Sequence, residues 1–181
     1  MALDASIAHC EHDHAHCIES ALQTANTLCQ AKGVRLTPLR EQVLKLIWQS
    51  HKPLGAYELM DMLANSTERR VAPPTVYRAL EFLLEQHLIH RINTLNAYIG
   101  CTHPNSEHAN NFLICEDCGV AIEFSSDPLM EAINCAAQHF DFQSRSQSLE
   151  IVGCCSQCLD CLLYTSPSPR DQRGSRMPSS A

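Results

Sequence analysis

The 181-residue sequence predicts an α/β fold, of the α+β type, divided between two small domains. In the first half of the chain, apolar residues recur at helical spacing, and shorter alternating segments follow. A Cys-x-x-Cys pair lies on each side of the last helical segment. Charge divides the chain in the same region, because residues 19–95 hold nine Lys/Arg against seven Asp/Glu, whereas residues 96–161 hold one Arg against nine acidic residues. We therefore expect two domains with different partners.

The first half is predicted to form four helices and then two short strands around a turn. The expected helices span residues 18–31, 56–64 and 75–87, with a further helix that begins at Pro38, and the expected strands span 88–93 and 97–101. Thr37 is expected to cap the second helix, with Pro38 at its first position and Glu41 near its positive end. Pro53 and Gly55 end that helix. Helices followed directly by a β-hairpin are typical of a winged helix-turn-helix.

The second half is predicted to form a small mixed domain. Its expected elements are strands over 111–115 and 120–124, a helix over 128–140 and a final strand over 143–152. We place the boundary between the two domains near residues 94–97, so that the first domain ends at residue 95.

Two pairs of cysteines carry the clearest chemical signal. Cys115 and Cys118 can reach one ion from a tight turn that Gly119 eases, and Cys155 and Cys158 supply a second pair. Four thiolates fit a closed tetrahedral zinc site, which would join distant segments of the second domain. The alternative is a set of buried or disulfide-bonded cysteines. Cys154 and Cys161 also leave open a shifted register of the second pair.

The composition indicates the compartment. The N-terminus has no basic start followed by an apolar stretch, and no apolar run reaches the length of a membrane span. Eleven cysteines without an export signal indicate a reducing cytoplasm, where thiols persist and bind metal. An odd number of cysteines also argues against a complete disulfide framework. We expect a cytoplasmic protein with no membrane partner.

The fourth predicted helix is a candidate for DNA recognition. It is apolar on one side and offers Thr75, Tyr77 and Arg78 near its N-terminus, the end that a recognition helix inserts into the major groove. Four further basic residues could engage flanking phosphates, namely Arg35, Arg40, Lys45 and Arg69. The alternative is an amphipathic helix whose Tyr and Arg are ordinary surface residues.

These motifs together resemble the ferric-uptake-regulator family. The resemblance rests on R-L-T-P-x-R over residues 35–40, P-T-V-Y-R-A-L over 74–80 and the paired Cys-x-x-Cys motifs. It extends over residues 18–158, and residues 73–86 are most similar to the zinc-uptake-regulator branch. The resemblance implies a dimeric, metal-dependent transcriptional repressor with an N-terminal winged helix and a C-terminal dimerisation domain.

The resemblance also implies two metal sites. Cys115, Cys118, Cys155 and Cys158 match the structural zinc site of the family. The sensory site of the zinc branch takes two His, one Cys and one Glu, and the matching residues are His90, Cys101, His108 and Glu123. His103 is close enough in sequence to compete with His108. A thiolate, two imidazoles and one carboxylate suit zinc, whereas a site of nitrogen and oxygen alone would suit iron or manganese better.

The expected function is therefore zinc-dependent repression of zinc-uptake genes. The implied cofactors are two Zn²⁺ per chain, one structural and one regulatory, and the implied partners are double-stranded operator DNA and a second copy of the chain. The expected DNA contacts are Arg35, Thr75, Tyr77 and Arg78. We expect no small-molecule substrate. The expected domains are a His/Cys-rich tail (1–17), a winged-helix DNA-binding domain (18–95), a zinc-binding dimerisation domain (96–161) and a Ser/Pro/Arg-rich tail (162–181). The last tail resembles translated vector sequence and is expected to be non-native.

Three alternatives remain at this point. A sibling sensor of iron, manganese or peroxide is disfavoured by Cys101 among the ligands. A zinc hydrolase would need an open coordination position and a base, but four ligands leave no such position, so we expect no enzyme. A zinc storage or delivery protein is favoured by the His/Cys tract at residues 9–17, for which weak metal scavenging and no specific role are both open.

Overall fold

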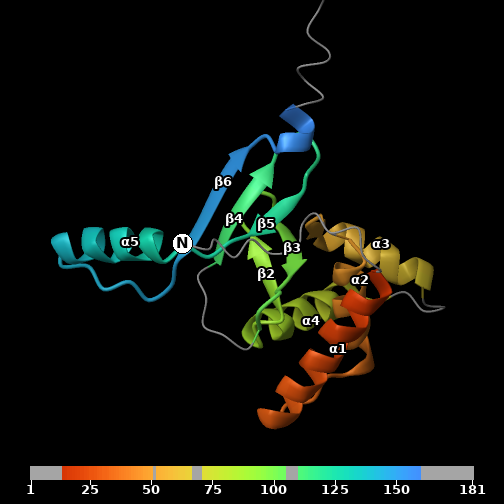
Figure 1. Ribbon diagram of the computed structural model, residues 1–181. Helices are drawn as coiled ribbons and strands as arrows, with labels where there is room; N and C mark the ends of the chain where they lie inside the picture. Colours follow the sequence, from red (N-terminus) through yellow and green to blue (C-terminus); the bar gives the residue numbers. More distant parts are fainter. Residues whose placement is uncertain (1–13, 51, 67–70, 105–109, 160–181) are drawn as a thin grey trace, which may run out of the picture.

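The computed structural model describes residues 14–50, 52–66, 71–104 and 110–159 (Figure 1). The helices are α1 (His14–Ala31), α2 (Pro38–Trp48), α3 (Ala56–Ser66), α4 (Pro73–Glu85) and α5 (Asp127–His139). The strands are β1 (Leu54–Gly55), β2 (Ile89–Ile92), β3 (Ala97–Gly100), β4 (Asn110–Cys115), β5 (Ala121–Glu123) and β6 (Ser148–Gly153). Helices combined with two small sheets confirm the predicted fold class. Among these described residues, no helix is both long and apolar enough to cross a bilayer.

The N-terminal half is a helical unit closed by a three-stranded antiparallel sheet. The helices α1 to α4 share one core, and the sheet has the order β1-β3-β2. Leu44 of α2 and Leu80 of α4 are each about 1% exposed, as the helical spacing of their apolar neighbours predicts. The strand β1 is an addition, because the sequence predicts only a break at Pro53 and Gly55. Thr37 is the N-cap residue of α2, as predicted, although its side chain makes no capping hydrogen bond.

The C-terminal half is a second three-stranded sheet with the order β5-β4-β6. The strand β4 pairs antiparallel with β5 and parallel with β6, so the connection that contains α5 crosses over to bring β6 alongside β4. In Figure 1, α5 extends away from the edge of this sheet, and none of its residues is buried. Cys135 of α5 is exposed, although a helix-interior position predicts a packing residue.

The two sheets meet through the hairpin of β2 and β3. Ile92 of β2 packs with residues of the second sheet in a small apolar cluster, whose other members are Phe112, Ile114, Ala121 and the half-buried Ile99. The predicted boundary near residue 95 falls in the turn between β2 and β3, which are paired from Ile89 to Ile92. Because a boundary there would divide one sheet, we propose that it lies after Gly100.

Candidate metal sites and a DNA-facing helix

The four paired cysteines gather at one end of the second sheet. Cys115 is the last residue of β4 and Cys118 lies in the turn after it, while Cys155 and Cys158 follow β6. One sulfur from each residue lies within 4.8 Å of all the others, and Cys118 Sγ is 3.8 Å from Cys155 Sγ. A tetrahedron with zinc–sulfur bonds of about 2.3 Å has edges of about 3.8 Å. The four thiols therefore fit a closed zinc site.

Backbone N–H groups favour the deprotonated, metal-binding form of Cys115 in this cluster. The N–H groups of Cys118 and Cys155 point at the Cys115 sulfur and lower the pKa of that thiol to about 6, and the Cys155 N–Cys115 Sγ distance is 3.3 Å. Cys154 lies beside the cluster and forms a separate group with Cys115 and Asp117. Cys154 is thus grouped with one thiol and one carboxylate, whereas Cys155 and Cys158 lie within reach of both Cys115 and Cys118. This geometry favours Cys155 and Cys158 over the shifted register; Cys161 lies outside the described residues.

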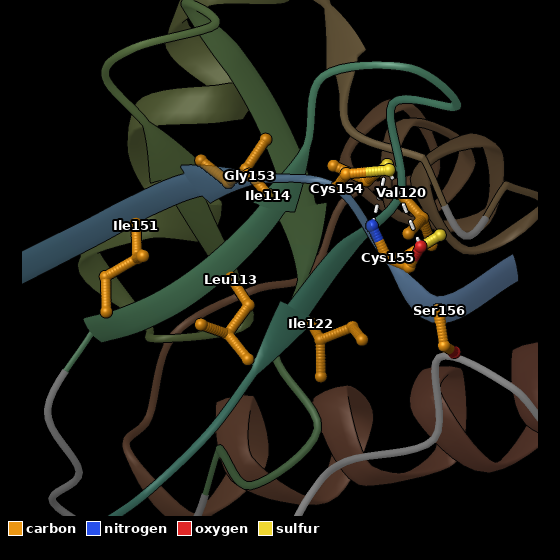
Figure 2. A pocket seen from close by; sticks show the side chains of 10 residues that line it. Leu113, Ile114, Val120, Ile122, Ile151, Gly153, Cys154, Cys155 and Ser156 are labelled. Atoms are coloured by element: carbon orange, nitrogen blue, oxygen red, sulfur yellow. Dashed lines mark hydrogen bonds between the residues drawn. The ribbon is translucent and has the colours of Figure 1, made fainter. Parts of the chain in front are cut away.

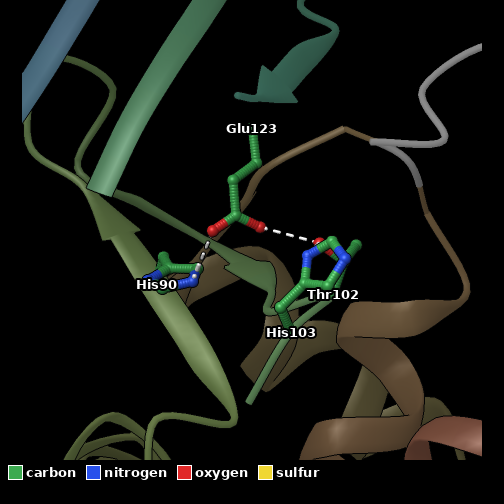
Figure 3. A network of polar contacts seen from close by, with 4 residues as sticks. All are labelled: His90, Thr102, His103 and Glu123. Atoms are coloured by element: carbon green, nitrogen blue, oxygen red, sulfur yellow. Dashed lines mark hydrogen bonds and ion pairs between the residues drawn. The ribbon is translucent and has the colours of Figure 1, made fainter. Parts of the chain in front are cut away.

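A second group lies where the two sheets meet. His90, Cys101 and Glu123 are 5%, 3% and 7% exposed, and each offers one donor atom within 4.8 Å of the others. The His90 Nε2 atom is 3.1 Å from Glu123 Oε1 (Figure 3). His90 and Cys101 belong to the β2–β3 hairpin, whereas Glu123 ends β5, so the group joins the two halves of the chain.

Strand register explains how these three side chains converge. His90 is opposite Ile99, so the two share a face of the hairpin, and Cys101, two residues beyond Ile99, falls on that face as well. In the second sheet, Phe112 is opposite Glu123 and shares its face. The His90 ring meets the Phe112 ring edge-on with centroids 5.5 Å apart. The same contact that packs the sheets together thus brings imidazole and carboxylate into reach.

The donor set of this buried group suits a soft divalent cation. Burial, followed by the nearby Glu123 charge, raises the pKa of Cys101 to about 12, so its thiol holds its proton unless a cation compensates. One thiol, one imidazole and one carboxylate are ligands that zinc accepts in tetrahedral sites. The residues present therefore fit a zinc ion, with a fourth donor still to be supplied.

The structure thus brings together three of the four residues predicted for the sensory site. His108 lies outside the described residues. His103 is exposed and is not a member of the group; its Nδ1 atom lies 2.9 Å from Thr102 Oγ1. Thr102 in turn donates a hydrogen bond of 2.9 Å to Glu123 Oε2. Sequence reasoning missed Thr102, and its position directly after Cys101 was the only available signal.

The helix α4 presents the residues predicted to face DNA. Val76 and Leu80 are buried in the core, whereas Thr75, Tyr77 and Arg78 are exposed at the N-terminal end of the helix. Tyr77 is 40% exposed despite its size. An anchored helix with polar and cationic groups on its outer face has the form of a recognition helix.

The flanking basic residues divide into two kinds. Arg35 and Lys45 are exposed and can meet a phosphate. Arg40 instead lies over the Phe82 ring, 3.5 Å from its centroid, and donates a 2.6 Å hydrogen bond to the carbonyl of Arg35. These contacts give Arg40 a structural role in holding the loop before α2. Arg69 lies outside the described residues.

A winged helix is joined to a small sheet, with a four-thiol group at the end of the sheet and a His/Cys/Glu group at the junction. This combination defines a metal-binding protein of the winged-helix class. The chain belongs to the ferric uptake regulator family, whose family model matches residues 31–152. It is 34% identical over 143 residues to the zinc uptake regulation protein of Escherichia coli (strain K12), an alignment covering 78% of this chain and 83% of the relative.

Solved structures agree with this assignment. A zinc uptake regulator complexed with zinc and DNA is 33% identical, with a TM-score of 0.76 over 81% of this chain and 97% of that chain. The crystal structure of holo XcZur is 38% identical, with a TM-score of 0.71 over 78% of this chain and 98% of that chain. The chain is therefore similar to the zinc-uptake-regulator branch, as the sequence motifs predict.

Proposed function

We propose that this protein is a zinc-responsive transcriptional repressor that acts in the cytoplasm on zinc-uptake genes. The observation that carries the proposal is the buried group of His90, Cys101 and Glu123 at the junction of the two sheets. Similarity to a zinc uptake regulation protein and to a regulator complexed with zinc and DNA supports it. A binding protein of this kind needs no catalytic residue, and we assign it no enzymatic activity.

Each chain holds two zinc ions in this proposal. Cys115, Cys118, Cys155 and Cys158 hold the structural ion, and His90, Cys101 and Glu123, with His108, hold the regulatory one. A zinc ion at the second site supplies bonds to both halves of the chain at once. Because His90 and Glu123 are 3.1 Å apart in this arrangement, zinc would bind it more tightly than an arrangement in which the sheets separate. Zinc binding then fixes the orientation of α4.

The DNA-binding surface in this proposal consists of Thr75, Tyr77 and Arg78 of α4, together with Arg35 from the loop before α2. The Arg78 guanidinium can bond the edge of a guanine, and Arg35 can meet a phosphate. A repressor of this type reads two successive major grooves, which requires two copies of α4 about 34–36 Å apart. Replacing both Tyr77 and Arg78 by Ala should abolish repression in a reporter assay while leaving zinc content unchanged. Full repression by that double variant would contradict the assignment.

A second copy of the chain supplies the partner α4. The outer face of the second sheet is apolar: Ile122, Leu113 and Ile151 lie side by side across β5, β4 and β6. Leu113 and Ile151 are 42% and 45% exposed, and the face is hollowed by about 400 Å³ (Figure 2). An exposed apolar face of this kind, beside a helix that buries none of its own residues, fits a homodimer interface.

The dimer assignment has a direct test. Ile151→Glu should convert the zinc-loaded protein to a monomer in sedimentation, because a charge would enter the apolar face. Leu95→Glu is the matched control, since Leu95 is 44% exposed but lies in the turn between β2 and β3. If Ile151→Glu remains a dimer like the control, this face is not the interface.

The regulatory assignment is tested by titrating zinc into protein that retains one zinc per chain, while binding to zinc-transporter promoter DNA is followed. We expect sharp zinc-dependent binding in the wild type and weakened dependence in Cys101→Ser. The control is Cys135→Ser, which changes an exposed thiol on α5. Binding that ignores zinc and responds to iron, manganese or peroxide would move the protein to another branch of the family. No binding with any metal would support storage instead.

A further inference from the structure

The two oxygens of Glu123 have different surroundings. Oε1 lies 3.1 Å from Nε2 of His90, another member of the ligand group. Oε2 accepts a hydrogen bond of 2.9 Å from Thr102 Oγ1. Figure 3 shows the carboxylate held between the imidazole on one side and the hydroxyl on the other. Because Glu123 is only 7% exposed, water has little access to replace the hydroxyl.

The direction of the hydroxyl proton follows from the neighbouring groups. Thr102 Oγ1 is the donor to Glu123 Oε2, and a hydroxyl has only one proton to donate. The 2.9 Å contact between Thr102 Oγ1 and His103 Nδ1 then requires a proton on that ring nitrogen. His103 donates to Thr102, and Thr102 donates to Glu123. The two bonds run in the same direction, and each strengthens the other.

This arrangement controls how Glu123 can bind a metal. A carboxylate that uses one oxygen adds one bond and is compatible with four-coordinate zinc, whereas a carboxylate that uses both oxygens raises the coordination number. Manganese prefers six ligands, mostly oxygen atoms, so a carboxylate that binds through both oxygens favours manganese. Zinc can be held by four ligands and does not require the second oxygen. The Thr102 hydroxyl engages one lone pair of Oε2 and makes that oxygen a weaker donor, which favours Oε1 as the ligand atom.

We propose that Thr102 is a positioning residue that sets metal selectivity: its hydroxyl restricts Glu123 to one ligand oxygen and thereby keeps the regulatory site four-coordinate. The proposal rests on the regulatory site of the proposed function. Thr102 is well placed for this role because it directly follows Cys101, so the same short segment supplies a ligand and orients another. Groups that hydrogen-bond to a ligand commonly change metal affinity by 10- to 100-fold when they are replaced.

The test compares Thr102→Val, which has the same shape but no hydroxyl, with Thr102→Ser, which keeps the hydroxyl. Co²⁺ is titrated into protein that retains its structural zinc, and visible spectra report the site. A tetrahedral field has no inversion centre, so four-coordinate Co²⁺ absorbs strongly, and added ligands reduce that absorption. Competition between Zn²⁺ and Mn²⁺ gives the selectivity of each variant.

In Thr102→Val, we expect the visible bands to weaken by about threefold and the preference for zinc over manganese to fall by about tenfold, since both Glu123 oxygens become able to bind. The sulfur-to-cobalt charge-transfer band from Cys101 should remain. Thr102→Ser should match the wild type in every readout. If Thr102→Val has the same spectra and the same metal selectivity as the wild type, the proposal is wrong.

The spectra of the wild-type protein test the regulatory site separately from the role of Thr102. A thiolate–cobalt band that appears in the wild type and is lost in Cys101→Ser establishes the regulatory site before any Thr102 variant is compared. If the wild type has no such band, the regulatory site itself is wrong and the selectivity role falls with it. If the band is present and Thr102→Val changes nothing, only the role of Thr102 is wrong.

Discussion

The two halves of this chain are stabilised by different means. Among the described residues, the N-terminal half has a core of seventeen buried residues drawn from α1 to α4 and the hairpin. The cluster of the second sheet has four, one of which is Ile92 of the hairpin. In addition, α5 buries no residue at all. A small unit with so little apolar burial needs a metal or a partner to remain folded. The four-thiol group and the exposed apolar face supply candidates for both.

This difference has a consequence for regulation. The N-terminal half can keep its form when the junction opens, because its core does not depend on the second sheet. The second half depends on its surroundings and can transmit a change at the metal group to a partner. A stable DNA-binding unit joined to a second unit whose fold depends on metal is a suitable arrangement for a zinc-controlled switch.

The largest expected effect comes from removing a structural thiol. Cys118→Ser should lower the zinc content by one ion per chain, and structural zinc commonly contributes about 10 kcal/mol or more to folding. Amide hydrogen exchange should then show loss of protection in β4, β5 and β6, while α2 and α4 keep theirs. Cys135→Ser is the control, since it alters an exposed thiol in the same domain. Retained protection in β4 to β6 would show that the second half does not need the metal.

The opposite experiment weakens the first half alone. Leu44 is about 1% exposed in the N-terminal core, and Leu44→Ala should reduce the free energy of unfolding by about 2–5 kcal/mol. Protection in α2 and α4 should fall, while the structural zinc stays bound. The control Leu95→Ala removes the same atoms from a residue that is 44% exposed. If Leu44→Ala also releases the structural zinc, the two halves are not independent.

The first half was also the more predictable from sequence. Its helices follow from apolar spacing and from Pro and Gly at their ends, which are local signals. The two-residue β1 was missed because Leu54 and Gly55 form a strand only through pairing with Tyr98 and Ala97, more than forty residues away. In the second half, the helix-interior position of Cys135 indicated packing, but Cys135 is exposed and α5 buries none of its residues.

The candidate sites show the same limit. The four cysteines could be grouped from their spacing, and His90, Cys101 and Glu123 from a family resemblance. Thr102 and Glu150 could not be found, because their partners lie 21 and more than 50 residues away and a single polar residue carries no periodic signal. Register and chain crossing bring such pairs together, and neither can be read from one sequence.

The connection between the halves can be disturbed at Gly100. A Cβ atom at this position would overlap the indole of Trp48, and its distance to Nε1 would be 2.6 Å. Gly100→Ala should therefore cost about 1–3 kcal/mol of unfolding free energy and displace the adjacent Cys101, weakening regulatory zinc. Because Trp48 is the only Trp in the chain, its fluorescence reports the displacement directly. The control is Gly153→Ala, where an added Cβ meets nothing within 4 Å. Equal stability and fluorescence in both variants would disprove the close contact.

The smallest expected effect concerns Glu150, which links β6 to the turn between β2 and β3. Its two carboxylate oxygens accept hydrogen bonds from the backbone N–H groups of Asn93 (2.7 Å) and Thr94 (2.8 Å). Desolvation raises the pKa of Glu150, but hydrogen bonds from the Thr94 side chain and from both N–H groups outweigh it, so the pKa lies below its ordinary value of 4.5. The ionised form is therefore the one that stabilises the junction.

The sign of the pH dependence follows from that lowered pKa. The contribution of Glu150 is fully present above about pH 4.5, the unfolded value, and is lost as the pH falls through the lower folded value. Glu150→Gln should reduce the free energy of unfolding by about 1 kcal/mol at pH 7, since the carboxylate is partly exposed to water. The gap between wild type and variant should close in urea unfolding at lower pH. Glu131→Gln changes an exposed carboxylate on α5 and should have no comparable effect. If Glu150→Gln behaves like this control at every pH, the link through the turn contributes nothing, and the apolar cluster and the metal group alone join the two halves.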